Sequence, residues 1–331
     1  MKHYIFVDYA TQAYSALVLA LILLFHNHTV PHWALLSGTH ILGLVLIHGL
    51  ILWQAKDRSS KPLDLLRHYY PILLYTAFFC ETSHLNRMFF NDYLDPMFIR
   101  WDQALFGCQP GVVFMRKLPW LMASELFYAA YFSYYLMIGG TGLALLLRNR
   151  QQFLHFVSVV SFVFYICYLI YIFVPVIGPQ VLIGEVPPDC VLPDALQGLV
   201  IQNASPDVVK SGPFFQLMAW IYQVFESPGA AFPSSHVAVA LCTVCFSFRY
   251  LRRVRYYHLG LAVMLCLATV YCHYHYGVDV LGGVIAAAIL VPAGNALYWK
   301  SESRRKGESA SPKSEGNPKS EIQKISPRTP C

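Results

Sequence analysis

Two short strings contain the residues of this chain whose types and spacing can do chemistry. In the first, Phe232-Pro233-Ser234-Ser235-His236, a proline and two serines precede a histidine at the start of an apolar run. Proline suits the first turn of a helix and serine is a good N-cap. The string therefore predicts a helix start whose free N–H groups and dipole hold an anion, with His236 placed to protonate a leaving oxygen. The alternative is a capped helix with an incidental histidine.

The second string, His275-Tyr276-Gly277-Val278-Asp279, pairs a histidine with a carboxylate. Residues four apart share a helix face, so Asp279 can keep one imidazole nitrogen of His275 protonated and direct the other as a nucleophile. The alternative is a buried structural hydrogen bond. Together the two strings offer two histidines, a carboxylate and a helix N-terminus to one phosphate group, which indicates phosphorus chemistry and not transport.

The chain that positions these strings is predicted to be an all-α, polytopic membrane helix bundle. Its 331 residues are 56% hydrophobic and 13% charged, and that charged fraction is about half of what soluble domains carry. Runs of about 20 apolar residues recur, and we expect about eight transmembrane helices. The expected spans are 9–25, 33–53, 70–90, 119–147, 153–177, 231–248, 257–274 and 277–299.

The basic residues are distributed unevenly among the connections. Most of the 24 Lys and Arg residues lie in 54–69, 148–150 and 249–256 and in the two terminal segments. Basic loops stay in the cytoplasm, so both termini are predicted to be cytoplasmic. The connections 91–118 and 178–230, and both histidine strings, are then expected on the non-cytoplasmic face.

Three regions are expected along the chain. Residues 1–69 form an N-terminal two-span extension, residues 70–299 a catalytic membrane domain, and residues 300–331 a disordered cytoplasmic tail, because the tail is polar and rich in Ser, Lys, Glu and Pro. Apolar side chains recur at helical spacing over 214–225 and, less regularly, over 93–106, which predicts interfacial helices on the outer face. A disulfide between Cys108 and Cys190, in two outer loops, is left open.

Both strings resemble the signatures of the type-2 phosphatidic acid phosphatase superfamily of membrane lipid phosphatases and phosphotransferases. More closely, residues 231–236 and 269–283 are similar to the branch that contains the inositol phosphorylceramide synthases. The segments 102–107 and 175–179 resemble upstream strings of that branch. The resemblance covers residues 70 to 295, approximately.

This resemblance implies a role for each residue. His275 attacks phosphorus and forms a phosphohistidine, Asp279 orients it, and His236 protonates the leaving group and then deprotonates the acceptor. The N–H groups around Ser234 and Ser235 hold the phosphoryl oxygens as negative charge builds up. No metal ion or other cofactor is implied.

The phosphate-binding positive charge of the superfamily is missing from its usual places. The chain has no Arg-Pro pair, and Thr269 stands where an arginine precedes the nucleophile by six residues. The two remaining candidates are His273, two residues before the nucleophile, and Arg87, at the outer end of the third span. For Arg87 the alternative is a structural ion pair with Glu81 or Asp92.

We therefore expect a membrane phosphotransferase that moves a phosphoryl-bearing headgroup, with phosphoinositol one candidate, between lipids, including sphingolipids. The alternative is a lipid phosphate phosphatase for a phosphatidate-like or isoprenyl phosphate, and a non-catalytic lipid binder or transporter is a third class. The missing arginines favour the transferase, because a dianionic monoester needs more positive charge than a diester. The expected partners are a phospholipid or lipid phosphate and the bilayer, with no nucleic acid. The compact loops favour a bacterial inner membrane over a Golgi-type membrane.

Overall fold

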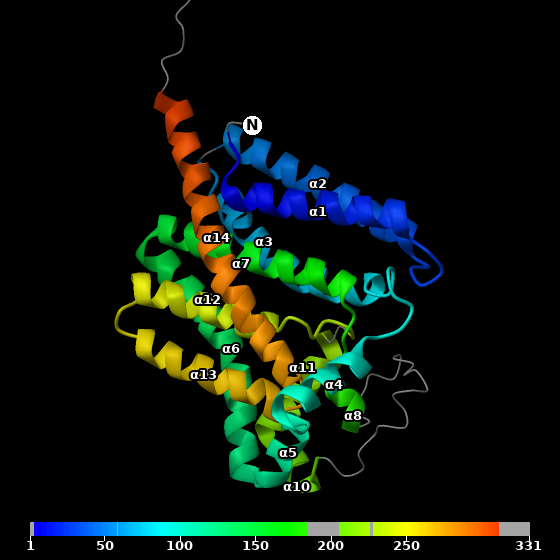
Figure 1. Cartoon of the computed structure of the whole chain (residues 1–331). Coiled ribbons are helices and arrows are strands. Elements are labelled where there is room, and N and C mark those ends of the chain that lie inside the picture. The colour runs from blue at the N-terminus through cyan, green and yellow to red at the C-terminus, as the bar shows by residue number, and fades with distance from the viewer. Residues whose placement is uncertain (1–2, 58, 184–204, 226–227, 311–331) are drawn as a thin grey trace, which may run out of the picture.

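The computed structural model describes residues 3–57, 59–183, 205–225 and 228–310, which fold into a helical bundle (Figure 1). In these residues there is no β-strand, and an isolated bridge joins Val176 and Ala230. The helices are α1 (Phe6–Phe25), α2 (Trp33–Lys56), α3 (Lys61–Leu85), α4 (Asp95–Phe106), α5 (Pro110–Lys117), α6 (Leu121–Arg148), α7 (Arg150–Phe173), α8 (Gln180–Ile183), α10 (Asp207–Lys210), α11 (Pro213–Phe225), α12 (Ser235–Tyr250), α13 (Arg255–Tyr271) and α14 (Gly277–Ala310).

Five of these helices are long and apolar enough to cross a membrane: α1, α2, α6, α7 and α14. The expected integral membrane bundle is compatible with this result. Helices also occupy the other three expected spans, but α12 is apolar and only 16 residues long, and α3 and α13 do not meet the same criterion of length and composition. The count of eight spans stays a prediction.

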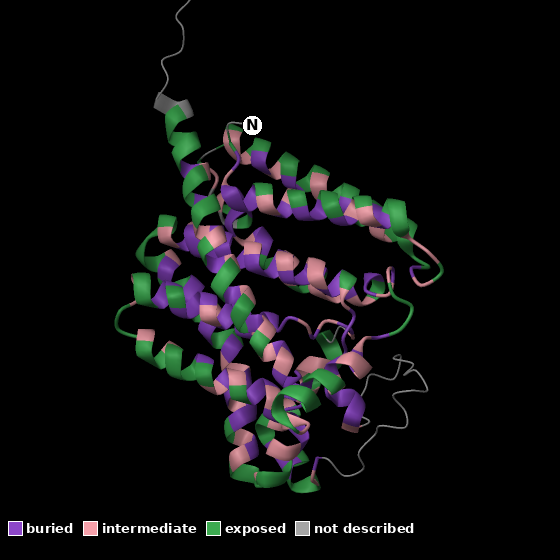
Figure 2. Ribbon diagram, viewed as in Figure 1, coloured by how far each residue is buried: buried purple, intermediate pink, exposed green. Residues whose placement is uncertain are grey.

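Helix α7 forms the centre of the bundle. It packs against α1, α3, α6, α12 and α14, and most of its length is buried (Figure 2). The outer helices instead expose large apolar side chains such as Leu24, Met122 and Leu147. Exposed apolar surface on this scale is typical of contact with lipid.

Polar contacts define one end of the bundle, which we call the basic end. Arg150 at the start of α7 contacts Asp64 at the start of α3, and Arg148 at the end of α6 donates to the carbonyl oxygen of Tyr250 at the end of α12. The α6–α7 and α12–α13 turns lie on the same side of the bundle (Figure 1). The N-terminal segment joins this end through Arg67 of α3, which donates to the carbonyl oxygen of His3 at 2.8 Å.

The two histidine strings lie at the opposite end, which we call the site end. The backbone N–H of Ser234 donates to the carbonyl oxygen of Asp279 at 3.1 Å, which joins the start of α12 to the start of α14. The segment before α12 also pairs with the end of α7, since Ala231 donates to Val176 at 2.8 Å. The strings therefore lie at one end, as predicted, and most basic connections lie at the other.

The structure bears on two further expectations, the helix over 214–225 and the disordered tail from residue 300. Helix α11 forms where the apolar pattern over 214–225 predicted a helix, and its position on the membrane surface stays a prediction. The tail is not disordered from residue 300, because α14 continues to Ala310. Its Lys, Glu and Arg residues are good helix formers, which explains the extension. Residues 311–331 and Cys190 lie outside the described part of the chain.

Candidate active site

The first string starts α12 as its serine and proline predicted. Ser234 is the N-cap, and its Oγ accepts from the N–H of Val237 at 3.4 Å. The N–H of Ser235 donates to the hydroxyl of Tyr171 at 3.1 Å, and that hydroxyl donates to the carbonyl of Pro233 at 2.9 Å. Because the N–H of Ser234 is bonded to Asp279, both amides predicted to hold phosphoryl oxygens already have acceptors within the protein.

The second string follows a sharp reversal between α13 and α14. The backbone of His273 is left-handed, with φ +60°, and the N–H groups of Tyr274 and His275 both donate to the carbonyl of Thr269 at 3.0 Å. This reversal directs Tyr274 and His275 into the interior, where both line a cavity.

The structure brings the two histidines together. The ring centroids of His236 and His275 lie 5.7 Å apart, with an interplanar angle of 59°. On the other side of His275, its Nδ1 lies 3.5 Å from Oδ2 of Asp279. The same Oδ2 accepts from the N–H of Tyr276 at 2.8 Å, so Asp279 also caps its own helix.

Burial controls the charge of His275. Its side chain is almost fully buried. This burial, and to a lesser extent the neighbouring imidazole of His236, lowers the pKa of His275 to about 3. The ring is therefore neutral at neutral pH, which is the form that can act as a nucleophile.

Two glycines of α14, Gly282 and Gly283, allow this helix to lie close to the start of α12. A Cβ on Gly283 would lie 2.6 Å from the carbonyl oxygen of Ser234, and a Cβ on Gly282 would lie 2.5 Å from the ring of Phe232. No side chain larger than hydrogen fits at either position without a shift. The glycine pair after the second histidine string therefore sets the distance between the two strings.

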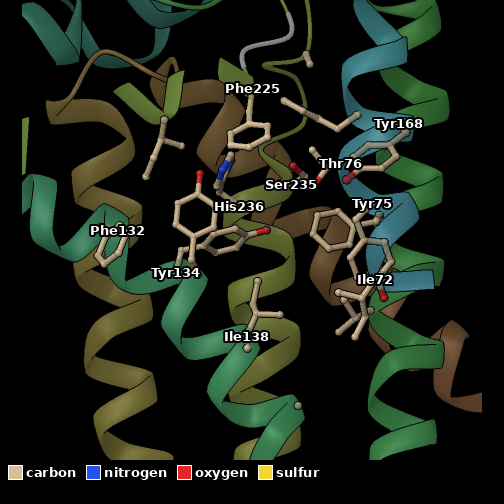
Figure 3. Close-up of a pocket in the computed structure, with 18 of the residues that line it drawn as sticks. Ile72, Tyr75, Thr76, Phe132, Tyr134, Ile138, Tyr168, Phe225, Ser235 and His236 are labelled. Carbon is tan, nitrogen blue, oxygen red and sulfur yellow. The ribbon is translucent and has the colours of Figure 1, made fainter. Parts of the chain in front are cut away.

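His236 and His275 line one end of a cavity of about 680 Å³, and Figure 3 shows His236 in this position. The residues lining that end belong to four different parts of the chain. They are Gln180, Tyr222, Ser235, His236, Tyr274 and His275. Within the described residues the cavity lining contains no Lys, Arg, Asp or Glu, so the site is polar but carries little formal charge.

A family model for the PAP2 superfamily matches residues 97–293, which is more than half of the chain and includes both histidine strings. The chain belongs to the PAP2 superfamily. No curated protein and no solved structure matches it. Membership of the PAP2 superfamily indicates an enzyme with lipid phosphatase or phosphotransferase activity.

A tyrosine that the sequence did not single out contacts the site of this PAP2 protein. The hydroxyl of Tyr131, on α6, lies 3.1 Å from Nε2 of His236 and 2.9 Å from the hydroxyl of Tyr222. The ring of Tyr222 in turn stacks on Tyr274, with centroids 4.0 Å apart. The available signal was the tyrosine-rich run 128–135 within an apolar helix.

Two buried carboxylates of α4 hold the second string in place. Asp102 accepts from the N–H groups of Gly277 and Val278, both at 2.9 Å, and so caps α14 from another helix. Asp95 accepts from the hydroxyl of Tyr276 at 3.0 Å and from the N–H of Gly178 at 2.9 Å. Burial raises the pKa of Asp95 to about 6, although its hydrogen bonds act in the opposite direction.

Neither of the two candidates for positive charge lines the cavity that contains the PAP2 histidine pair. His273 is buried against Gly111 of α5 and does not line the cavity, and burial lowers its pKa to about 4, so it is neutral. The guanidinium carbon of Arg87 lies 5.8 Å from the ring centroid of Tyr93. In the described chain Arg87 forms no ion pair with Glu81 or Asp92, and Glu81 lies 2.9 Å from Nε2 of His40.

A metal site is not apparent in the part of the chain that the structure describes. No three or more His, Cys, Asp or Glu side chains are grouped there so as to hold an ion.

Proposed function

We propose that this PAP2 protein is a membrane phosphotransferase that transfers a phosphoryl-bearing headgroup from one lipid to the hydroxyl of another. The observation that carries the proposal is the 5.7 Å separation of the His236 and His275 rings at one end of a single cavity. One phosphorus atom between these rings can be attacked by one of them while the other serves the leaving oxygen.

The reaction then has two steps. In the first, which begins with the imidazole of His236 protonated, a ring nitrogen of His275 attacks phosphorus, the bond from phosphorus to the leaving oxygen breaks, and His236 gives that oxygen its extra proton. In the second, His236 takes the proton of the acceptor hydroxyl, the acceptor oxygen attacks phosphorus, and the bond to His275 breaks. Asp279, 3.5 Å from Nδ1 of His275, keeps that nitrogen protonated and stabilises the ring as it becomes positive. In the structure this contact is too long or misaligned to be a hydrogen bond, and catalytic contacts of this kind often shorten when substrate binds.

The charge of the lining supports a phosphodiester donor. A monoester carries close to two negative charges, and sites for such groups generally use Arg or Lys. The described lining has neither, whereas a diester carries a single charge. Tyrosine hydroxyls and the partial positive charge of the helix dipole at the N-terminus of α12 can balance that charge. Because the strings also resemble the inositol phosphorylceramide synthase branch, we take a phosphoinositol lipid as the donor to test first.

A lipid phosphate phosphatase is the second candidate, since the PAP2 superfamily includes such enzymes. Water would then replace the lipid acceptor in the second step. We place the site on the non-cytoplasmic face of the membrane with both termini in the cytoplasm, because the basic end carries most of the Lys and Arg residues.

The test uses the purified full chain in lipid vesicles with a phosphatidylinositol donor, with and without ceramide or diacylglycerol. The proposal expects headgroup transfer that needs the acceptor, and an acid-labile phosphoenzyme that maps to His275. His275→Ala should abolish both while His258→Ala, which changes a histidine near the basic end, retains them. Acceptor-independent release of inorganic phosphate from a lipid monoester would instead identify the phosphatase. Undiminished turnover in His275→Ala would reject both mechanisms.

A further inference from the structure

The cavity extends far beyond the histidine pair. It follows one face of α7 from Tyr168 near the site end to Phe153 near the basic end. At the rise of an α-helix this stretch is about 22 Å long, compared with about 15 Å for one leaflet of a bilayer's hydrocarbon core. We call this part of the cavity, beyond the histidines, the slot.

The two walls of the slot come from α3 and α6. Both helices pack on α7, but among the described residues they have at most minor contact with each other. Figure 3 shows Ile72 and Tyr75 of α3 on one side and Tyr134 and Ile138 of α6 on the other, with His236 above them. The gap between α3 and α6 therefore forms the front of the slot, and α7 forms its back.

The slot opens sideways between α3 and α6. Ile72, Tyr135 and Leu143 line it and are also exposed on the surface of the bundle, so the opening lies where α3 and α6 would face lipid. At its inner end the slot is lined by the rings of Tyr69 and Phe153, whose centroids lie 5.9 Å apart.

The interior of the slot is apolar. Aromatic rings and aliphatic side chains of α3, α6 and α7 supply most of its lining. The hydroxyl of Tyr75 is bonded to Oγ of Ser161 at 2.8 Å, so this residue presents its ring to the slot. A polar or charged chain would lose its hydration there without gaining partners.

From these observations we propose that the slot binds one long hydrocarbon chain of the lipid whose phosphate lies at the histidines, and that this chain enters sideways between α3 and α6. The placement of the phosphate rests on the proposed function, whereas the chain site rests on the cavity itself. A chain leaving the bilayer for the slot gains little hydrophobic free energy, because it was already among hydrocarbon. Discrimination must therefore be steric, and the slot selects for chain length.

Gly139 is a position at which a larger side chain would project into the slot and shorten it. It lines the slot, and a Cβ at this position would meet no atom within 4 Å. It lies about 8 Å along α6 from Tyr134, whose ring is 4.6 Å from that of His236. The next residue, Gly140, has equally open space but does not line the slot. Gly139→Leu and Gly140→Leu are thus a matched pair, and both replace glycine by a better helix former.

The experiment has a binding arm and a kinetic arm, both on the full chain in vesicles. For binding, hexadecyl phosphate and an isoprenyl phosphate of similar length, each with a photoreactive group at the tail end, are crosslinked and the labelled residues are mapped. We expect label near Tyr69 and Phe153 in wild type, in Gly140→Leu and in His275→Ala, and at least a tenfold loss of label there in Gly139→Leu. Label from the alkyl chain identifies an acyl-type lipid, and label from the isoprenyl chain alone identifies an isoprenyl phosphate.

For kinetics, kcat/KM is compared for donors with octanoyl and with palmitoyl chains. Gly139→Leu should lower the long-to-short ratio at least tenfold, and Gly140→Leu should leave it within twofold of wild type. Crosslinks scattered over the outer surface would contradict the proposal that the slot binds the chain. An equal loss of kcat/KM for octanoyl and palmitoyl donors in Gly139→Leu would contradict it too. If the inner end is labelled but no turnover depends on His275, the slot still binds the chain and the proposed function is rejected.

Discussion

The hydroxyl of Tyr131 and Nε2 of His236 lie 3.1 Å apart, although the two residues are 105 positions apart in the sequence. Tyr131 is fully buried, and its hydroxyl also contacts the hydroxyl of Tyr222. Because of this contact, Nε2 is the nitrogen of His236 that already has a hydrogen-bond partner before substrate binds. Tyr131 is therefore a positioning residue for the proposed general acid.

Tyr131→Phe should lower kcat about fivefold while changing KM little, because a net hydrogen bond of about 1 kcal/mol no longer holds His236. The limb of the pH–rate profile that reports His236 should also move. Tyr134→Phe is the control, since the ring of Tyr134 lies 4.6 Å from that of His236 on the same helix. An unchanged pH profile in Tyr131→Phe, or the same change in both variants, would rule out the positioning role.

Gly283→Ala should separate the two strings. Its Cβ would lie 2.6 Å from a backbone oxygen, that of Ser234, which cannot rotate away as a side chain can. Overpacking of this kind destabilises by about 1–3 kcal/mol, and the distance between His236 and His275 would increase. We expect a lower unfolding temperature and a loss of kcat of at least tenfold.

Gly260→Ala is the matched control for that substitution. Gly260 lies in α13, and a Cβ there meets nothing within 4 Å. This variant should keep wild-type kcat and be as stable or slightly more so, because alanine favours a helix over glycine. If Gly283→Ala also keeps full activity, the close approach of α12 and α14 does not matter for catalysis.

Features that depend on residues close together in the sequence could be predicted from the sequence alone. The cap at Ser234, the start of α14 at Gly277 and the position of both strings at one end follow from local spacing and from apolar runs. The lengths of the runs were less informative. Residues 70–90 were expected to span the membrane, but α3 runs from Lys61 to Leu85, and no 18-residue stretch of it is apolar enough to meet the criterion for a span.

Contacts between distant segments could not be predicted from the sequence. Asp102 caps α14 from 175 residues away, and nothing in its own surroundings in the sequence indicates that role. The amide of Ser235 was expected to be free for phosphate, yet a tyrosine of α7, Tyr171, supplies its acceptor. Each of these partners depends on how the helices pack, and packing is set by side chains that no local pattern identifies.

The pH dependence of stability should reveal the buried, neutral state of His275. Its pKa is lowered from an ordinary value of about 6.5 to about 3 by burial and by His236. Between those two values the unfolded chain binds a proton that the folded chain does not, so this residue destabilises the fold increasingly as the pH falls from 6.5 toward 3.

His275→Gln removes that titration while keeping a polar side chain. The variant should therefore lose less thermal stability than wild type when the pH is lowered from 7 to 4.5, as measured by the unfolding temperature in detergent. Asp95, whose pKa is raised to about 6 by burial, acts in the opposite direction, but it is common to both proteins and cancels in the comparison. An equal loss in the two proteins would mean that His275 is not buried in its neutral form.

Sidedness can be tested with single cysteines at the two ends of the bundle. Val208, in α10 at the site end, and Arg253, in the α12–α13 turn at the basic end, are both exposed. In a background without Cys108 and Cys190, Val208→Cys should react with a membrane-impermeant thiol reagent added to intact cells. Arg253→Cys should react only after permeabilisation, because basic connections remain in the cytoplasm. The reverse pattern would place the histidine pair on the cytoplasmic face, so the proposed enzyme would have to draw its lipid from the inner leaflet.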